Sequence, residues 1–135
     1  MTQGDSTAPR SGCVVAVDDH ATFRSAVRRV IGTSANLILV GEAESGEAAI
    51  ALVRALRPDL VLMDVSMPGI GGIAAATEIK AFTPSTVVVL VSATHPDNLR
   101  HQTRGCPADE ILWKRDLRPL LLEQIWSRHN VVSVA

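Results

Sequence analysis

Short apolar runs, each closed by a polar residue, a glycine or a proline, recur along the chain. There are five of them, over residues 13–17, 37–40, 60–64, 87–91 and 110–113. Apolar runs of this length between turn-forming residues are typical of β-strands buried on both faces of a sheet. The pattern therefore predicts five buried strands, the first followed by carboxylates and the third ending at one.

The segments between these runs carry apolar residues at the spacing of an amphipathic helix. In the first segment, Phe23, Val27 and Ile31 follow one another at every fourth position. Asp116 is the expected N-cap of the last segment. Helices are predicted over about 20–32, 45–57, 71–83, 97–104 and 116–126. Strand and helix alternate five times, which predicts an α/β fold with a doubly wound parallel sheet and helices on both faces.

The length and composition fit one domain with an aliphatic core. A chain of 135 residues can bury a full core, with 47% apolar residues and only 3% aromatic ones. We expect one domain over residues 13–128, a disordered polar tail over 1–12 and a short tail over 129–135.

Charge and hydropathy narrow the range of partners. The net charge is −1 and no basic block occurs, so direct nucleic-acid binding is not expected. No apolar run approaches the ~20 residues that span a bilayer, and residues 1–12 lack the apolar segment of a signal peptide. A cytoplasmic protein without a membrane partner is therefore expected. Cys13 and Cys106 fall on strands too far apart for a disulfide, which predicts two reduced thiols.

Chemically distinctive side chains stand at the carboxyl ends of the predicted strands. Asp18 and Asp19 follow the first strand, Asp64 ends the third, Ser92 the fourth and Lys114 the fifth. In open α/β sheets, these ends form the ligand-binding edge. Buried carboxylates are costly unless paired or metal-bound, and Mg²⁺ is the hard cation that such a group suits. With a hydroxyl and a lysine beside them, they predict a phosphoryl-transfer site in which a carboxylate can be the nucleophile.

Each of these residues also has a simpler interpretation. Asp64 alone could be an exposed acid, Asp18 or Asp19 could cap the next helix, and Lys114 could be solvated. Their joint placement favours a site. Residues 69–74 also fit the G-x-G-x-x-A pattern of dinucleotide sites, but they do not follow the first strand and the next strand lacks a terminal acid. The four histidines show no metal-ligand spacing.

The residues at these strand ends resemble the receiver domain of two-component response regulators. The matching segments are Val17-Asp18-Asp19-His20, Pro58-Asp59-Leu60-Val61-Leu62-Met63-Asp64, Met67-Pro68-Gly69, Gly72, Val91-Ser92-Ala93 and Lys114. The Asp-Asp-His opening and the Ala-rich helix after Gly46 are most similar to receivers that carry LuxR-type DNA-binding domains. The resemblance runs from about Cys13 to Arg128 and implies a flavodoxin-like fold of five βα units with strand order 2-1-3-4-5.

The resemblance implies a metal site for Mg²⁺ at the acidic residues. Asp18 and Asp19 match the acidic pair that holds the ion, Asp19 directly. Asp64 and the backbone carbonyl of Ser66 would complete the shell of protein ligands.

The resemblance also implies a signalling role rather than an enzymatic one. Asp64 would accept a phosphoryl group from a sensor histidine kinase, followed by the switch hydroxyl of Ser92 and paired by Lys114. The chain would act as a phosphorylation-dependent switch in a phosphorelay, with at most self-phosphorylation and self-dephosphorylation activity.

Two positions depart from the family pattern. Ile111 stands where the family often has a Tyr or Phe that rotates on activation, and Pro107-Ala108 replaces the usual Gly-Ala. The output face is expected to comprise the fourth helix, fifth strand and fifth helix, where Trp113 offers aromatic surface to a partner protein or a second copy. No helix-turn-helix segment follows in this sequence, so a stand-alone receiver is expected.

Two alternative functions stay open on the sequence. The departures fit a degenerate receiver that binds partners without phosphorylation and has no Mg²⁺ affinity. A phosphatase of the haloacid-dehalogenase type also uses an aspartyl nucleophile, but it needs a second acid where Ser66 stands and a cap segment for which there is no room.

Overall fold

A parallel five-stranded sheet forms the centre of the computed structural model, which describes residues 11–130. The strands are β1 (Gly12–Val17), β2 (Leu37–Ala43), β3 (Leu60–Asp64), β4 (Val87–Ser92) and β5 (Glu110–Trp113). Their order in the sheet is β2-β1-β3-β4-β5, and every neighbouring pair is parallel. The predicted flavodoxin-like α/β fold and its strand order are confirmed.

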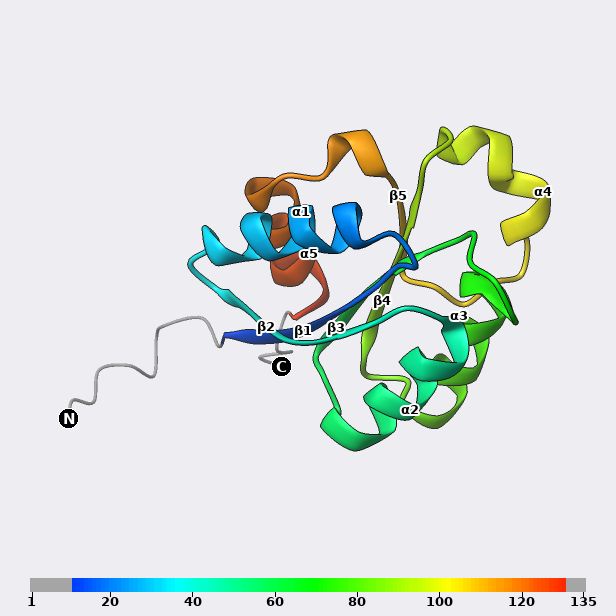
Figure 1. Cartoon of the computed structure of the whole chain (residues 1–135), viewed down its shortest axis with the longest axis horizontal. Helices are drawn as coiled ribbons and strands as arrows, with labels where there is room; N and C mark the ends of the chain where they lie inside the picture. Colours follow the sequence, from blue (N-terminus) through cyan, green and yellow to red (C-terminus); the bar gives the residue numbers. More distant parts are fainter. Residues whose placement is uncertain (1–10, 131–135) are drawn as a thin grey trace, which may run out of the picture.

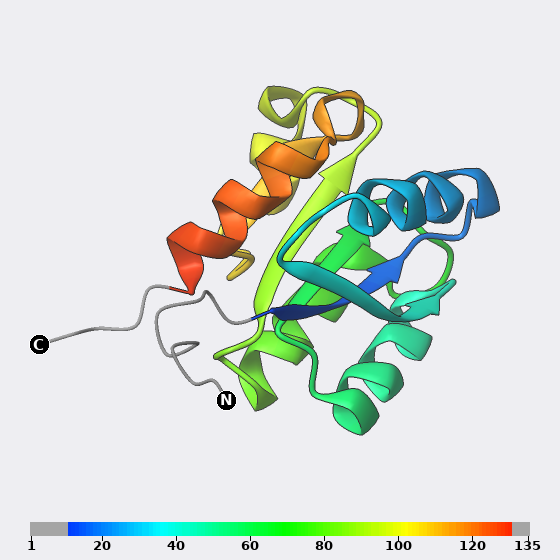
Figure 2. The same cartoon turned by 90° about the vertical axis from the view of Figure 1, so that its left-hand side faces the viewer.

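Helices cover both faces of this sheet. The helices are α1 (Ala21–Gly32), α2 (Gly46–Leu56), α3 (Gly71–Phe82), α4 (Arg100–Thr103) and α5 (Pro119–His129). Helices α1 and α5 lie on one face, and α2 and α3 lie on the other (Figures 1 and 2). In the described part of the chain, no helix has the length and apolar character needed to cross a bilayer.

Alternating side chains of the strands feed two separate core layers. Val15, Val17 and Met63 pack toward α2 and α3, whereas Val14 and Leu62 pack toward α1 and α5. Every residue of β3 and β4 is buried, as expected for central strands that are covered on both faces. Burying each of these large aliphatic side chains contributes about 1.5–3 kcal/mol, so the core fixes the strand ends that carry the polar residues. The expected aliphatic core is confirmed, since Trp126 is the one buried aromatic side chain among residues 11–130.

Strand β2 runs further than the sequence suggested. We expected it to stop at Val40 because Gly41 interrupts the apolar run, but it continues to Ala43. The β1–β2 register shifts between Val14 and Val15, where Val14 pairs with Leu39 and Val15 pairs with Gly41. The irregularity places Gly41 against α2, where a Cβ atom would lie 3.1 Å from one side-chain atom each of Leu52 and Leu56. The glycine therefore allows close packing instead of ending the strand.

The segment between β4 and β5 is less helical than expected. The predicted helix over 97–104 is a 3₁₀ turn at Pro96–Leu99 followed by the four residues of α4. Leu99 is the buried side chain of this segment, and α4 itself buries none. Without an apolar face to pack, the backbone lacks the tertiary contacts that stabilise a longer helix.

The start of the last helix also differs from the prediction. Asp116 is not the N-cap, because it lies in a 3₁₀ turn at Lys114–Asp116, and α5 begins at Pro119 after Arg118. Proline lacks the backbone N–H that would be unpaired at the first helical position, and its fixed φ suits a helix start, which favours a start at Pro119. The expected tails fall mostly on residues 1–10 and 131–135, which lie outside the described residues. Of the tail residues that are described, Gly12 belongs to β1 and His129 to α5.

Candidate functional site

The carboxyl ends of four strands meet at one edge of the sheet. Val17 pairs with Met63, Asp64 with Val91, and Ser92 with Trp113. The polar residues in these pairs, or directly after them in the chain, therefore lie on the same edge of the sheet. The structure thereby brings together the predicted residues Asp18, Asp64, Ser92 and Lys114.

An ion-paired lysine lies between the two buried carboxylates. Lys114 Nζ donates to Asp18 Oδ2 at 2.6 Å and lies 3.5 Å from Asp64 Oδ1. Asp18 is completely buried and Asp64 is only 4% exposed. The ammonium also sits 4.4 Å from the centre of the Phe23 ring. One cation thus faces two carboxylates, which leaves a net negative charge inside the site.

Burial, together with this charge imbalance, changes the acidity of Asp64. Burial raises the pKa of the Asp64 carboxyl above its usual range, and the neighbouring Asp18 carboxylate raises it further. Lys114 and the backbone N–H of Ser66 oppose this rise without cancelling it. A carboxylate that is both buried and repelled by another is destabilising until a cation or a covalent modification relieves it.

Replacing Asp64 by asparagine is therefore expected to stabilise the metal-free protein at neutral pH. A raised pKa means that the folded state holds the Asp64 proton more tightly than the unfolded state does. Asp64 thus costs stability as the pH rises above its ordinary pKa of about 3.9, by about 1.4 kcal/mol for each unit of the rise. Denaturation of wild type and Asp64→Asn in EDTA should show the gain at pH 7 and its disappearance near pH 3. A wild type that is the more stable at pH 7 contradicts this prediction.

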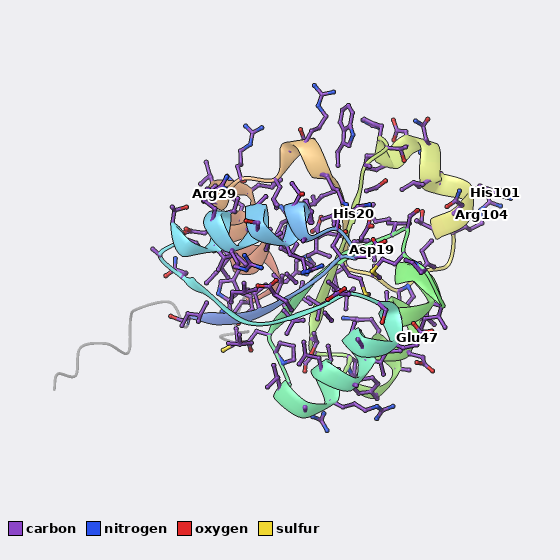
Figure 3. The ribbon with its side chains drawn as sticks, in the orientation of Figure 1. Asp19, His20, Arg29, Glu47, His101 and Arg104 are labelled. Carbon is purple, nitrogen blue, oxygen red and sulfur yellow. The ribbon has the colours of Figure 1, made fainter. Side chains whose placement is uncertain are left out.

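Asp19 and His20 lie in the loop between β1 and α1 (Figure 3). Together with Asp18 and Asp64 they form a group that we call the acidic corner. Asp19 Oδ1 is buried but accepts no hydrogen bond from any residue within 11–130, although His20 Nδ1 lies 3.2 Å away. Ligand atoms of Asp18, Asp19, His20 and Asp64 all lie within 4.8 Å of one another. An oxygen without a donor, among carboxylates in excess, fits a divalent cation.

His20 is a member of this group that was not among the predicted site residues. Its backbone N–H donates to Asp18 Oδ1 at 2.8 Å, and its Nδ1 lies 3.0 Å from the same oxygen. His20 is also the N-cap of α1, which has no side-chain cap. Asp18 and Asp19 therefore do not cap the helix, which was their simpler interpretation. His20 belongs to the Asp-Asp-His segment that resembles the family, but a single histidine has no ligand spacing, so the sequence assigned it no role in the site.

A small pocket opens beside Asp64. Its volume is about 140 Å³, and its lining comprises His20, Asp64, Ser66, Ser92, Ala93, Thr94 and Lys114. The Ser92 and Thr94 hydroxyls are 3.0 Å apart, and Ser92 Oγ also accepts the Thr94 N–H. The buried hydroxyl of Ser92 thus lies in the same pocket as Asp64. A larger groove of about 520 Å³ along α2 is lined by alanines, Leu52, Glu42 and Glu44, and its lining contains no lysine or hydroxyl beside the two acids.

Glycines shape the loop that follows Asp64. Gly69 and Gly71 adopt φ values of +81° and +78°, which residues with a side chain rarely adopt. A Cβ atom on Gly72 would lie 2.0 Å from the carbonyl oxygen of Asp64. Helix α3 therefore starts directly against the backbone of Asp64. The loop predicted from Met67-Pro68-Gly69 is present, with Ser66 exposed at its beginning.

The two positions that depart from the family pattern lie on β5 and before it. Ile111 packs against the core layer that contains α2 and α3, together with Cys106 and Ala108. Trp113 lies at the rim instead, where its Nε1 donates to the Ala93 carbonyl at 3.2 Å and its ring meets that of His95 edge-on at 4.9 Å. The aromatic ring next to the site is thus held by the loop that follows Ser92.

A family model described as "Response regulator receiver domain" matches residues 14–125. The curated "Response regulator GacA" of Pseudomonas aeruginosa is 42% identical over 84 residues, which are 62% of this chain and 39% of that protein. The "Probable transcriptional regulatory protein NarL" of Mycobacterium tuberculosis is 33% identical over 117 residues, 87% of this chain and 54% of that protein. The chain thus spans about half or less of the curated relatives it matches.

Solved structures agree in fold. The signal receiver domain of NarL from Mycobacterium tuberculosis superposes with a TM-score of 0.81 at 31% identity, covering 92% of this chain and 100% of that one. A LuxR-family two-component response regulator from Aurantimonas superposes with a TM-score of 0.74 at 27% identity, covering 89% of this chain and 86% of that one.

Proposed function

The chain belongs to the receiver domains of the response regulators of two-component systems, and on that basis we propose that it is a phosphorylation-dependent switch in which Asp64 accepts a phosphoryl group from a sensor histidine kinase. Family membership leaves the haloacid-dehalogenase alternative without support. The observation that carries the proposal is that Asp64 and Lys114 line one pocket, while carboxylate oxygens of Asp19 and Asp64 lie within 4.8 Å of each other.

Receiver domains bind Mg²⁺ at an acidic cluster, and the residues present here fit that ion. Asp19 and Asp64 would bind it through their carboxylates, Ser66 through its backbone carbonyl, and Asp18 would support the site from its ion pair with Lys114. When bound, the ion would supply positive charge that offsets the excess carboxylates and the incoming phosphoryl oxygens.

Asp64, Lys114 and Ser92 would each have a separate role in the transfer of the phosphoryl group. Asp64 attacks phosphorus through a carboxylate oxygen, the bond from phosphorus to the donor breaks, and the donor leaves with that electron pair. Lys114 offers its ammonium to the new phosphoryl group. Ser92 can exchange its bond with Thr94 for one to a phosphoryl oxygen, because both hydroxyls already lie in the pocket.

Incubation with a small phosphodonor and Mg²⁺ should add one phosphoryl group to the protein, measured by intact-protein mass spectrometry. Asp64→Asn should show no addition, because it lacks the nucleophilic carboxylate. Asp59→Asn is the matched control, since Asp59 lies just before β3 at the opposite end of the strand, where it accepts the Cys13 N–H at 2.8 Å. No addition to the wild type, or equal addition to Asp64→Asn, overturns the proposal.

The output would pass through the face built from α4, β5 and α5 to a partner protein or a second copy of the chain. Helix α5 exposes Leu120, which is 64% accessible, and Trp113 is half-buried at the same end. The packed position of Ile111 favours, as the second candidate, a receiver that binds its partner without phosphorylation. Absent Mg²⁺ affinity in calorimetry would support that second candidate.

A further inference from the structure

The acidic corner is held from outside by one arginine. Arg24 lies on the first turns of α1, and its side chain is 13% exposed. Its Nη1 donates to the backbone carbonyl of Asp18 at 2.7 Å. On its other side, Nε lies 3.3 Å from Glu42 Oε1, at the end of β2. The guanidinium therefore connects α1, the end of β1 and the end of β2.

We infer that Arg24 is a positioning residue for the metal site, acting through the Asp18 carbonyl to set the direction of Asp19. The inference rests on the proposed function, because it concerns the same Mg²⁺ site. Arg24 would not touch the ion or the phosphoryl group itself.

The reasoning starts from the peptide between Asp18 and Asp19. This unit is planar, so the direction of the Asp18 carbonyl also fixes the N–H and the start of Asp19. The Asp18 N–H donates to Ala43 O at 3.0 Å, and the Asp18 side chain is held by His20 and Lys114. The carbonyl is the remaining polar group of Asp18, and Arg24 binds it. Without that bond, the peptide is free to rotate and Asp19 Oδ1 loses its fixed place.

The contacts require an arginine in particular. A planar guanidinium can donate to the Asp18 carbonyl from one nitrogen while another faces Glu42, and it stays charged at any relevant pH. A lysine has one compact donor group and can serve only one of the two acceptors well. Partners that orient metal ligands in this way typically change metal affinity by about 10–100-fold when they are removed.

Arg28 provides a matched control on the next turn of the same helix. Its Nε and Nη2 bind the two carboxylate oxygens of Glu42 at 2.5 and 3.0 Å. Arg28 shares with Arg24 the helix, the charge and the partner Glu42, but it does not reach Asp18 in the structure. Arg28→Gln therefore removes a cation without removing the bond to the carbonyl.

A purely electrostatic role of Arg24 and a positioning role predict opposite changes in Mg²⁺ affinity when Arg24 is replaced. Removing a positive charge near a cation site reduces repulsion, so a purely electrostatic role of Arg24 makes Arg24→Gln bind Mg²⁺ more tightly. Loss of positioning makes it bind more weakly. The sign of the change separates the two roles.

The test is calorimetric titration of Mg²⁺ into the wild type, Arg24→Gln, Arg24→Lys and Arg28→Gln, with melting temperatures in EDTA recorded for each. We expect roughly tenfold weaker binding for Arg24→Gln, a smaller loss for Arg24→Lys and wild-type affinity for Arg28→Gln. The Mg²⁺ concentration for half-maximal phosphorylation should rise in parallel, while the rate at saturating Mg²⁺ changes little.

The outcomes separate this inference from the proposed function. Equal or tighter Mg²⁺ binding by Arg24→Gln overturns the positioning role and leaves the metal site in place. A wild type that binds no Mg²⁺ overturns both. If Arg24→Gln does not fold, Arg24→Lys decides: weakened binding supports the role, and wild-type affinity overturns it.

Discussion

Replacing Gly72 by alanine is expected to lower the free energy of unfolding by about 3 kcal/mol, the upper end of the usual range for overpacking and forced backbone shifts. The new Cβ atom would lie 2.0 Å from Asp64 O and 2.9 Å from Asp64 C, both backbone atoms of a central buried strand. Neither atom can move without displacing β3 or the start of α3, whose Gly72 N–H donates to Val65 O at 3.0 Å. Urea or guanidinium denaturation of the purified protein measures the loss.

The matched control is Gly32→Ala, near the end of α1. Apart from its own helix backbone and its two neighbours in sequence, no atom of residues 11–130 lies within 4 Å of a Cβ atom built there. Alanine should leave the stability unchanged or raise it by up to about 1 kcal/mol, because it is the better helix former. The close approach to Asp64 is disproved if Gly72→Ala costs no more than about 1 kcal/mol. Phosphorylation of any folded Gly72→Ala protein should also be slower, since the same shift moves Asp64.

The fold could be predicted from the sequence where burial alone decides the structure. The strands β3 and β4 are continuous apolar runs, and their ends placed Asp64 and Ser92 correctly. The prediction failed at elements that depend on tertiary packing. Gly41 continues β2 because Leu52 packs against it, and the segment with α4 has no apolar face to extend it.

The sequence predicted the site residues that stand at strand ends. It did not predict the residues that reach the site from other elements. The alternation of strands and helices places Asp18, Asp64 and Lys114 on one edge without knowledge of any contact. Arg24 is different, because it arrives from a helix through a side chain bonded to a backbone carbonyl. No residue spacing records such a bond, since it depends on how α1 lies over the ends of β1 and β2.

Lys114→Met is expected to destabilise the metal-free protein by about 3 kcal/mol at pH 7, as removal of one partner from a buried ion pair commonly does. Without the ammonium, Asp18 and Asp64 become two buried carboxylates that face no cation. The loss should shrink as the pH falls, because protonation removes the repulsion, and it should shrink when Mg²⁺ is added. Denaturation curves at pH 7 and pH 4, with EDTA or Mg²⁺, measure these effects.

Lys80→Met is the control that distinguishes an effect specific to the site from the general effect of losing a shielded lysine. Lys80 is as shielded as Lys114, with side chains 14% and 17% exposed, and Lys80 Nζ binds Asp109 and two backbone carbonyls away from the strand ends. It should lose comparable stability, but Mg²⁺ should restore none of it, because Asp109 is the only carboxylate paired with Lys80 within residues 11–130. Rescue of Lys114→Met alone would mean that the Lys114 ammonium takes the place of the metal charge when the protein is metal-free. Equal responses of both variants to Mg²⁺ would mean that Lys114 is only a structural ion pair.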